Sequence, residues 1–356
     1  MIAARYTQPG RFAVVNDAPV PSIGDEDLLL KVQATALCGT DVKIVRHGHR
    51  KLRDGQSLVL GHEFVGTIER RGARVTGFHV GQAVGVAPNM GCGRCEMCAQ
   101  GLGNMCPDYA AFGITGDGSH AEFVRIPADA IRQGNVIPLP GGVPYAAAAL
   151  SEPLSCVINA QRQTDIAAGD TVLVYGAGPM GLLHIMLAAI SGAGRIVAAD
   201  IAAPRLAQAR AAGATDTIHS QAQAVPAWVA AHTGGRGVDV AVIAVPVPAL
   251  QGEALNLLAP FGRLCLFAGW AKGAEGVTLD TNPIHYRGLK VTGTTGGSVR
   301  DYGAALRLIA ARRVRVDRII SDIFDFGHLQ DAYAAAMSGD RMKIVVTADG
   351  RLDSGT

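Results

Sequence analysis

The first part of the chain contains short apolar runs of the kind that form β-strands. These runs lie at residues 28–34, 64–70, 83–87 and 121–126, and glycine and proline separate them. Apolar positions at helical spacing are scarce before residue 145. The first 150 residues are therefore predicted to form a compact, mostly antiparallel β domain.

The pattern changes near residue 145, where an alanine-rich stretch at 145–163 has helical character. After it, expected strands at 171–175, 195–199, 238–244, 264–267 and 290–293 alternate with expected helices at 180–191, 204–212, 221–233 and 250–258. Such alternation predicts an α/β, doubly wound Rossmann domain with a parallel sheet. Beyond about residue 294, a helix at 302–311 and a strand at 343–347 need not belong to that sheet.

Length and composition narrow the class of protein. The 356 residues suggest two domains, and 49% hydrophobic with 17% charged residues indicates an ordered chain. A net charge of +2 without a basic stripe gives no reason to expect a nucleic-acid partner. The sequence shows no secretory signal and no apolar run long enough for a membrane span, so a cytoplasmic protein is expected.

A glycine-rich motif follows the expected strand at 171–175. Residues 176–181 read G-A-G-P-M-G, which fits the dinucleotide-binding pattern G-x-G-x-x-G between a strand and a helix. Gly176 is expected to permit the tight turn, Gly178 to admit the diphosphate, and Gly181 to allow close helix packing. Pro179 and Met180 complete the loop at the start of a helix whose free N–H groups attract phosphate.

Asp200 ends the second expected strand, nineteen residues after Gly181. An acid at about this distance accepts hydrogen bonds from the adenosine ribose, and its charge repels a 2′-phosphate. NAD is therefore expected rather than NADP, although an ordinary turn residue at a strand end would look the same.

Four of the seven cysteines lie within fifteen residues, at Cys92, Cys95, Cys98 and Cys106. Four thiolates close a tetrahedral zinc shell without water, which is typical of a structural site. An iron–sulfur cluster is the rival ligation, but the run lacks the longer ferredoxin motif. Four packed free thiols, or a nucleic-acid-binding finger, fit the spacing less well.

A second group, formed by Cys38, His62, Glu63 and Glu152, is dispersed along the chain. Thiolate, imidazole and carboxylate are suitable zinc ligands, and fewer than four protein ligands leave a position for substrate. Spacing alone does not justify this grouping. Cys38 could be a small core residue, His62 a buried histidine with satisfied hydrogen bonds, and Glu63 a surface carboxylate.

These motifs together resemble the zinc-containing medium-chain dehydrogenase/reductase family. The pattern G-H-E-x2-G-x5-G-x2-V at 61–75 matches that family's zinc signature at every fixed position. The C-G-T-D segment at 38–41, the four-cysteine lobe and the glycine motif follow in family order over about 170 residues. E-P-L at 152–154 resembles the polyol and threonine dehydrogenase branch.

The resemblance implies a GroES-like catalytic domain at 1–155, a Rossmann domain at 156–294 and a return to the catalytic domain at 295–356. It also implies NAD and two zinc ions per chain. Cys38 and His62 would bind the catalytic zinc, with Glu63 and Glu152 alternating with water. Asp41 would orient the zinc-binding histidine.

The resemblance further assigns proton transfer and cofactor contacts. Thr40 matches the hydroxyl that takes the proton from the substrate alcohol. Many relatives have histidine at the place of Lys43, so the relay is expected through Lys43, nearby His47 or water. Arg205 resembles a contact to the adenosine ribose, and Lys343 is expected near the cofactor diphosphate.

The expected activity is hydride transfer between a secondary alcohol and NAD. The substrate is expected to be a small molecule: a sugar alcohol, a cyclitol or aminocyclitol, or an amino alcohol, with L-threonine 3-dehydrogenase activity as an alternative. A non-catalytic NAD-binding sensor on the same fold is an alternative of another class. Phe112, His120 and Trp270 are candidate pocket residues, and a homotetramer is expected, with a dimer as the alternative.

Overall fold

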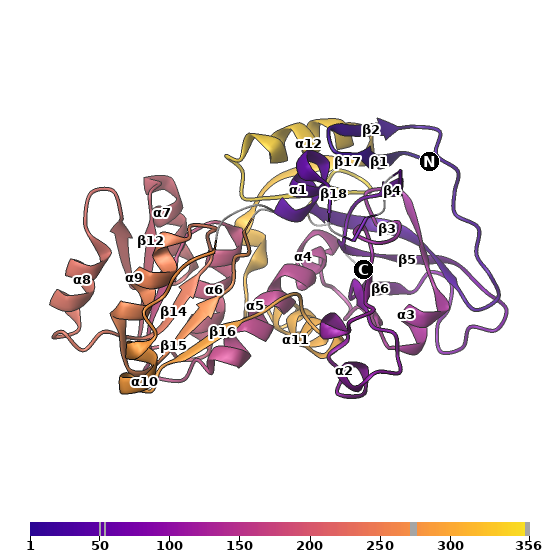
Figure 1. Ribbon diagram of the computed structural model, residues 1–356. Helices are drawn as coiled ribbons and strands as arrows, with labels where there is room; N and C mark the ends of the chain where they lie inside the picture. Colours follow the sequence, from indigo (N-terminus) through magenta and orange to yellow (C-terminus); the bar gives the residue numbers. More distant parts are fainter. Residues whose placement is uncertain (50, 53–54, 271–275, 353–356) are drawn as a thin grey trace. The chain divides into compact units, whose positions relative to one another are not determined.

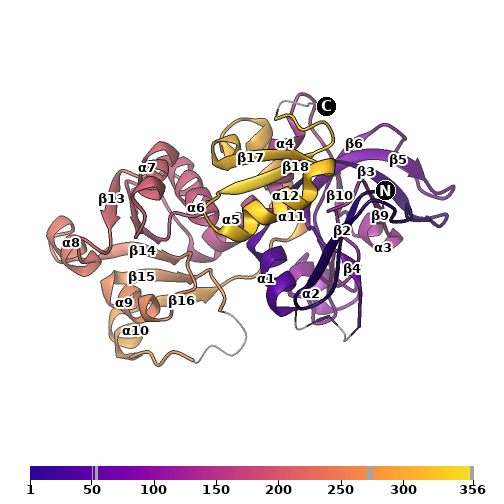
Figure 2. The same ribbon diagram turned by 90° about the horizontal axis from the view of Figure 1, so that it is seen from above.

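The computed structural model describes residues 1–49, 51–52, 55–270 and 276–352. They form two compact units (Figures 1 and 2). Unit 1 contains residues 1–155 and 296–356, and unit 2 contains residues 156–295. No helix in the described residues is long and apolar enough to cross a membrane.

Unit 1 is built on a seven-stranded sheet in the order β10-β6-β5-β3-β18-β17, with β9 also paired to β3. The strands are β3 (Leu28–Leu37), β5 (Glu63–Arg71), β6 (Ala83–Val86), β9 (Phe123–Ile126), β10 (Val136–Pro138), β17 (Ile320–Asp325) and β18 (Lys343–Thr347). The pairing is antiparallel except between β17 and β18. The C-terminal strand β18 lies beside β3 (Figure 1), so the end of the chain completes the sheet.

Smaller elements surround this sheet. A three-stranded sheet joins β1 (Ala3–Gln8), β2 (Arg11–Val15) and β4 (Leu58–Val59), and β7 (Asn89–Met90) pairs with β8 (Ala110–Ala111). The helices are α1 (Gly39–His47), α2 (Glu96–Ala99), α3 (Ala128–Arg132), α4 (Tyr145–Ala149), α11 (Val299–Ala310) and α12 (Leu329–Ser338). Three short 3-10 turns are η1 (Gly103–Met105), η2 (Val316–Ile319) and η3 (Phe326–His328).

Unit 2 is a six-stranded parallel sheet in the order β13-β12-β11-β14-β15-β16, the doubly wound arrangement that the alternation predicted. Its strands are β11 (Thr171–Tyr175), β12 (Arg195–Asp200), β13 (Asp216–His219), β14 (Val238–Ile243), β15 (Leu258–Leu266) and β16 (Lys290–Gly293). Its helices are α6 (Pro179–Ile190), α7 (Ala203–Ala212), α8 (Val225–His232), α9 (Ala249–Leu257) and α10 (Asn282–Arg287). Helices α6 and α7 cover one face, and α9 and α10 cover the other (Figure 2).

Several expected boundaries were wrong for local reasons. The single helix expected at 145–163 is two helices, α4 and α5 (Ser151–Thr164), and Pro153 falls in the first turn of α5, where proline is tolerated. Helix α8 begins at Val225 rather than at 221, because Pro226 suits a helix start. Helix α11 begins three residues before the expected 302, because Ser298 and Asp301 form a capping box.

Candidate active site

Three candidate metal ligands meet in unit 1 through the pairing of β3 with β5. Ala36 on β3 lies opposite Glu63 on β5, so Cys38, just beyond β3, reaches the residues that begin β5. One ligand atom from each of Cys38, His62 and Glu63 lies within 4.8 Å of the others. The strand register therefore assembles a thiol, an imidazole and a carboxylate from two distant sequence segments.

Asp41 lies beside the histidine of this group. The Nδ1 atom of His62 lies 3.4 Å from Oδ1 of Asp41, and Oδ2 of Asp41 accepts a 2.8 Å hydrogen bond from the Cys38 amide. Burial alone would raise the pKa of Asp41, but His62 and His120 bring it down to about 2. A buried anion at Nδ1 leaves Nε2 of His62 for a metal ion, which is the usual support of a zinc-binding histidine.

This donor set fits zinc. Zinc accepts a thiolate, an imidazole and a carboxylate, and a site with three protein ligands keeps a position for water or substrate. His62 is 5% exposed and Glu63 is fully buried. Water therefore competes little for these ligands.

Lys343 is buried beside Glu63. Its Nζ lies 2.5 Å from both carboxylate oxygens of Glu63 and 3.2 Å from the Leu37 carbonyl oxygen. Burial lowers the pKa of an ammonium group, but the Glu63 carboxylate outweighs this and raises the pKa of Lys343. The position of Lys343 on β18, next to β3, brings it to Glu63, and a contact with the cofactor diphosphate stays a prediction.

Glu152 lies in the first turn of α5 and is 7% exposed. Its charge raises the pKa values of both Glu63 and Lys343, so it lies near the ion pair. Among the residues described, the compact group of metal-binding atoms includes Glu63 and not Glu152. The geometry thus separates two carboxylates that the sequence left equivalent.

Helix α1 carries the residues expected to move the proton. Asp41, Ile44 and Val45 are buried, whereas Thr40 is half-buried and Lys43 and His47 are exposed. Thr40 lies in the first turn of this helix, two residues after Cys38, the candidate metal-binding thiol.

Two of the expected pocket residues belong to the core of unit 1. His120 is fully buried, with Nδ1 2.5 Å from the Tyr333 hydroxyl and Nε2 3.3 Å from the Ala36 carbonyl oxygen. Phe112 packs edge-on against Phe64. His120 thus packs in the core, Phe112 both packs there and lines the pocket described next, and Trp270 in unit 2 is half-buried.

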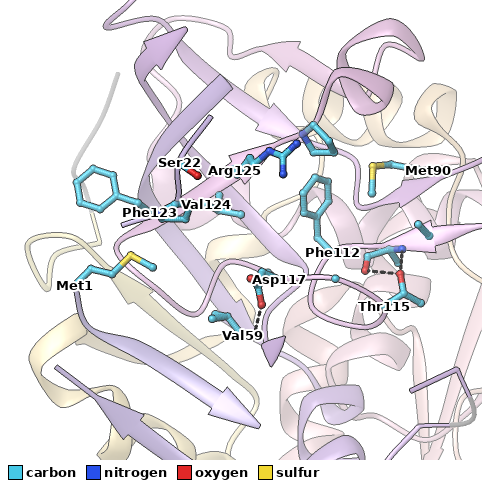
Figure 3. Close-up of a pocket in the computed structure, with 16 residues that line it drawn as sticks. Met1, Ser22, Val59, Met90, Phe112, Thr115, Asp117, Phe123, Val124 and Arg125 are labelled. Carbon is cyan, nitrogen blue, oxygen red and sulfur yellow. Dashed lines mark hydrogen bonds between the residues drawn. The ribbon is translucent and has the colours of Figure 1, made fainter. Parts of the chain in front are cut away.

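A pocket of about 440 Å³ lies elsewhere in unit 1 (Figure 3). Phe112, Asp117, Phe123 and Arg125 are among its lining residues. None of the candidate catalytic zinc ligands lines it. This pocket is therefore distinct from the site around Cys38.

The four cysteines of the lobe at 92–106 converge as expected. Their sulfur atoms all lie within 4.8 Å of one another, with 3.5 Å between Cys95 and Cys98 and 3.7 Å between Cys95 and Cys106. A zinc ion bound to four thiolates requires sulfur–sulfur separations of about 3.8 Å. All four cysteines are free of disulfide bonds, so the lobe fits a structural zinc.

The glycine motif forms the loop between β11 and α6 in unit 2. Gly176 has a φ of +93°, and a Cβ on Gly181 would lie 1.8 Å from the Gly176 carbonyl oxygen. By contrast, a Cβ on Gly178 would meet no protein atom within 4 Å. Gly176 and Gly181 are thus required by the protein itself, whereas Gly178, which caps α6, borders open space that suits a phosphate.

Asp200 closes this loop from the end of β12. Its Oδ2 accepts a 2.7 Å hydrogen bond from the Ala177 amide, and Oδ1 accepts a 2.9 Å bond from the Ala202 amide. The carboxylate is therefore held beside the glycine loop while each oxygen keeps a further lone pair. Arg205 is half-buried in the first turn of α7, and Pro179 and Met180 begin α6.

Two family profiles match the chain. The alcohol dehydrogenase GroES-like domain matches residues 24–141, and the zinc-binding dehydrogenase domain matches residues 179–311. The first contains Cys38, His62 and Glu63 with the cysteine lobe, and the second begins inside the glycine motif.

Curated relatives cover nearly the whole chain. Sorbitol dehydrogenase from Bacillus subtilis is 31% identical and the alignment covers 93% of both proteins. L-threonine 3-dehydrogenase from Pyrococcus horikoshii is also 31% identical, over 97% of this chain and 98% of the relative.

Solved structures agree with this assignment. The alcohol dehydrogenase TADH from Thermus sp. ATN1 has a TM-score of 0.88 at 26% identity, covering 98% of this chain and 99% of that one. The alcohol dehydrogenase RspB from E. coli CFT073, solved with NADH, has a TM-score of 0.86 at 26% identity, covering 98% of this chain and 99% of that one. The chain belongs to the zinc-containing medium-chain dehydrogenase family, in its polyol and threonine dehydrogenase branch.

Proposed function

We propose that this protein transfers hydride between a secondary alcohol and NAD with the help of a zinc ion. The observation that carries the proposal is the convergence of Cys38, His62 and Glu63, whose ligand atoms lie within 4.8 Å of one another. Three protein ligands leave a position for the substrate oxygen. The dehydrogenase names of the relatives support the same chemistry.

A zinc ion in this site would act as a Lewis acid on the substrate hydroxyl. Asp41 then holds His62 in the orientation that a metal requires. The Thr40 hydroxyl is the proposed acceptor of the substrate proton, which continues to solvent through Lys43, His47 or water. Glu63 is the proposed carboxylate ligand of the zinc ion, and Glu152 is the alternative carboxylate ligand.

The proposed cofactor is NAD, held by the loop at Gly176, Gly178 and Gly181. One solved relative contains NADH, and a zinc-binding dehydrogenase from Sinorhizobium meliloti contains NADP, so the family accommodates both. Asp200 favours NAD here, because its carboxylate, 7% exposed and held by two backbone amides, would repel a 2′-phosphate. Arg205 is proposed to contact the adenosine ribose.

We further propose that unit 1 is the catalytic domain and unit 2 the cofactor domain. The substrate class proposed from the relatives is a sugar alcohol, a cyclitol or aminocyclitol, or an amino alcohol, with L-threonine as the specific alternative. A homotetramer and a cytoplasmic location stay predictions.

The test is NADH formation across sugar alcohols, cyclitols, aminocyclitols and L-threonine, each with NAD and with NADP, on protein whose zinc content is measured. Turnover with NAD and two zinc ions per chain is the expected result. In the Asp200→Asn variant, the preference for NAD over NADP should fall about tenfold or more, since one buried charge is removed. A protein that binds NADH and only the lobe zinc, and turns over nothing, would favour the non-catalytic sensor.

A further inference from the structure

Helix α1 presents a polar face that starts at the proposed proton acceptor. Thr40, Lys43 and His47 are spaced at three and four residues, which places them on one face of the helix. Asp41, Ile44 and Val45 occupy the buried side. With a rise of about 1.5 Å per residue, Lys43 and His47 lie about 4.5 and 10.5 Å along the axis from Thr40.

This face lies in the most cationic part of the N-terminal region. Residues 42–53 contain five lysine or arginine residues and two histidines, and no aspartate or glutamate. The protein as a whole is nearly balanced, with 32 cationic and 30 acidic residues. The stretch immediately after the C-G-T-D segment is therefore locally cationic, with five of the 32 lysine and arginine residues.

The described cations in this segment divide into two groups. Arg46 donates a hydrogen bond to the Met337 carbonyl oxygen, and Lys51 donates one to the Tyr109 carbonyl oxygen while lying 3.4 Å from the centre of its ring. These two cations are used inside the protein. Lys43 and His47 are exposed, and their side chains form no hydrogen bond or ion pair with a residue that the structure describes.

We propose, resting on the function proposed above, that the substrate is an anionic polyol whose carboxylate or phosphate binds Lys43 and His47. Among the described cations of this segment, Lys43 and His47 on the Thr40 face are the ones without a hydrogen bond or ion pair to a described residue. The lysine side chain is long enough to meet an anionic group several bonds from the reacting carbon. A charged hydrogen bond is about twice as strong as a neutral one, so such a group adds both affinity and orientation. The positive field also speeds the approach of an anion.

This assignment competes with a role for Lys43 in the proton relay, and kinetics distinguish the two. A relay role affects kcat for every substrate, whether charged or neutral. If Lys43 binds the anion, replacing it raises KM for the anionic substrate and reduces the difference in kcat/KM between charged and neutral substrates.

The experiment compares matched substrates with the zinc- and NAD-loaded enzyme: D-glucitol, D-gluconate and D-glucitol 6-phosphate, and the corresponding galactitol series. We expect kcat/KM for one anionic member to exceed that of its neutral parent by about tenfold or more. A preference for gluconate or galactonate would identify a sugar acid, and a preference for the phosphates would identify a phosphate ester. In Lys43→Gln this advantage should be lost chiefly through KM, with a smaller loss in His47→Gln.

The matched control is Lys31→Gln, which removes one exposed positive charge from β3 and should keep the anionic preference. The advantage should also fall as ionic strength rises. Equal kcat/KM for charged and neutral members, or an equal effect of Lys43→Gln on both, would overturn the anionic substrate and leave the proposed dehydrogenase function standing.

Isothermal titration calorimetry of the same compounds with the NADH-loaded enzyme tests the anion site separately from the dehydrogenase function. If no compound reduces NAD although both zinc ions are bound, the dehydrogenase proposal fails with these substrates. Binding of the anionic members that Lys43→Gln abolishes would still support the anion site. Absence of such binding would reject it.

Discussion

Glu63 and Lys343 are 280 positions apart, yet Nζ of Lys343 lies 2.5 Å from each carboxylate oxygen of Glu63. The pair forms because β3 is hydrogen-bonded to β5 on one side and to the C-terminal strand β18 on the other. Both side chains are buried: 0% of the Glu63 side-chain surface and 4% of that of Lys343 are exposed. The last strand of the chain therefore supplies the cation that balances a proposed zinc ligand.

Replacing Lys343 by methionine should destabilise unit 1. The change leaves the buried Glu63 carboxylate without its cation, and removing one partner of a buried pair costs about 3–5 kcal/mol. The loss is measured by urea unfolding in the presence of a zinc chelator. Bound zinc then does not add to the free energy of unfolding.

Two further variants check the interpretation. Lys343→Arg keeps a positive charge and should lose less stability than Lys343→Met. The double variant Glu63→Gln, Lys343→Met removes both charges, so its loss should be smaller than the sum of the single losses. Simple additivity would show that the two side chains do not act as a pair.

Replacing Cys92 by serine should remove one zinc ion per chain. The other three sulfurs cannot close the tetrahedral shell that their spacing fits, so the lobe should lose its metal while the Cys38 group retains its own. Metal analysis after gel filtration should give one zinc per chain for this variant. Cys265→Ala, which changes a cysteine outside the lobe, should keep two. Two zinc ions in Cys92→Ser would contradict the assignment.

Alanine at Gly178 and at Gly181 should have different effects. A Cβ at Gly178 meets no protein atom, so Gly178→Ala should lose less than about 1 kcal/mol of stability. It should nevertheless weaken NADH binding about tenfold, because the methyl group enters the space proposed for the diphosphate.

The Gly181 variant is the structural counterpart. Its Cβ would lie 1.8 Å from the Gly176 carbonyl oxygen, so Gly181→Ala should lower the free energy of unfolding by about 1–3 kcal/mol. Fluorescence titration with NADH and urea unfolding measure the two properties separately. Unchanged NADH affinity in Gly178→Ala would argue against the proposed place of the diphosphate.

Unit 2 should lose stability in mild acid because of His184. Burial lowers the pKa of His184 to about 3, well below the 6.5 of an exposed histidine. Between these values the unfolded chain binds the proton and the folded chain does not, so stability falls as the pH falls below about 6.5. From pH 7.5 to pH 5 this group alone should cost about 2 kcal/mol.

Both tryptophans, Trp228 and Trp270, lie in unit 2, so their fluorescence reports its unfolding. His184→Gln does not titrate and should show a pH dependence weaker by the same amount. If the variant and the parent lose stability equally between pH 7.5 and pH 5, His184 is not the group responsible.

Much of the fold could be predicted because local sequence patterns determine its strands and helices. The alternating strands and helices of unit 2 follow from hydrophobic periodicity, and the parallel sheet order agrees with the prediction. The cysteine lobe and the glycine motif are short-range features whose residues must meet, because few residues separate them. Helix boundaries were less accurate, since a proline or a capping box moves a helix start by a few residues.

The sequence by itself determined which chemical groups are present: the thiols, His62, the two glutamates, the glycine loop and Asp200. Only the tertiary structure decided which of them meet. Strand register placed Glu63, rather than Glu152, with Cys38 and His62, and it brought Lys343 to Glu63. Packing likewise turned His120 into a buried partner of Tyr333. The physical reason is that these contacts span tens to hundreds of residues, and the relative shift of paired strands, which no local pattern records, sets which side chains face one another.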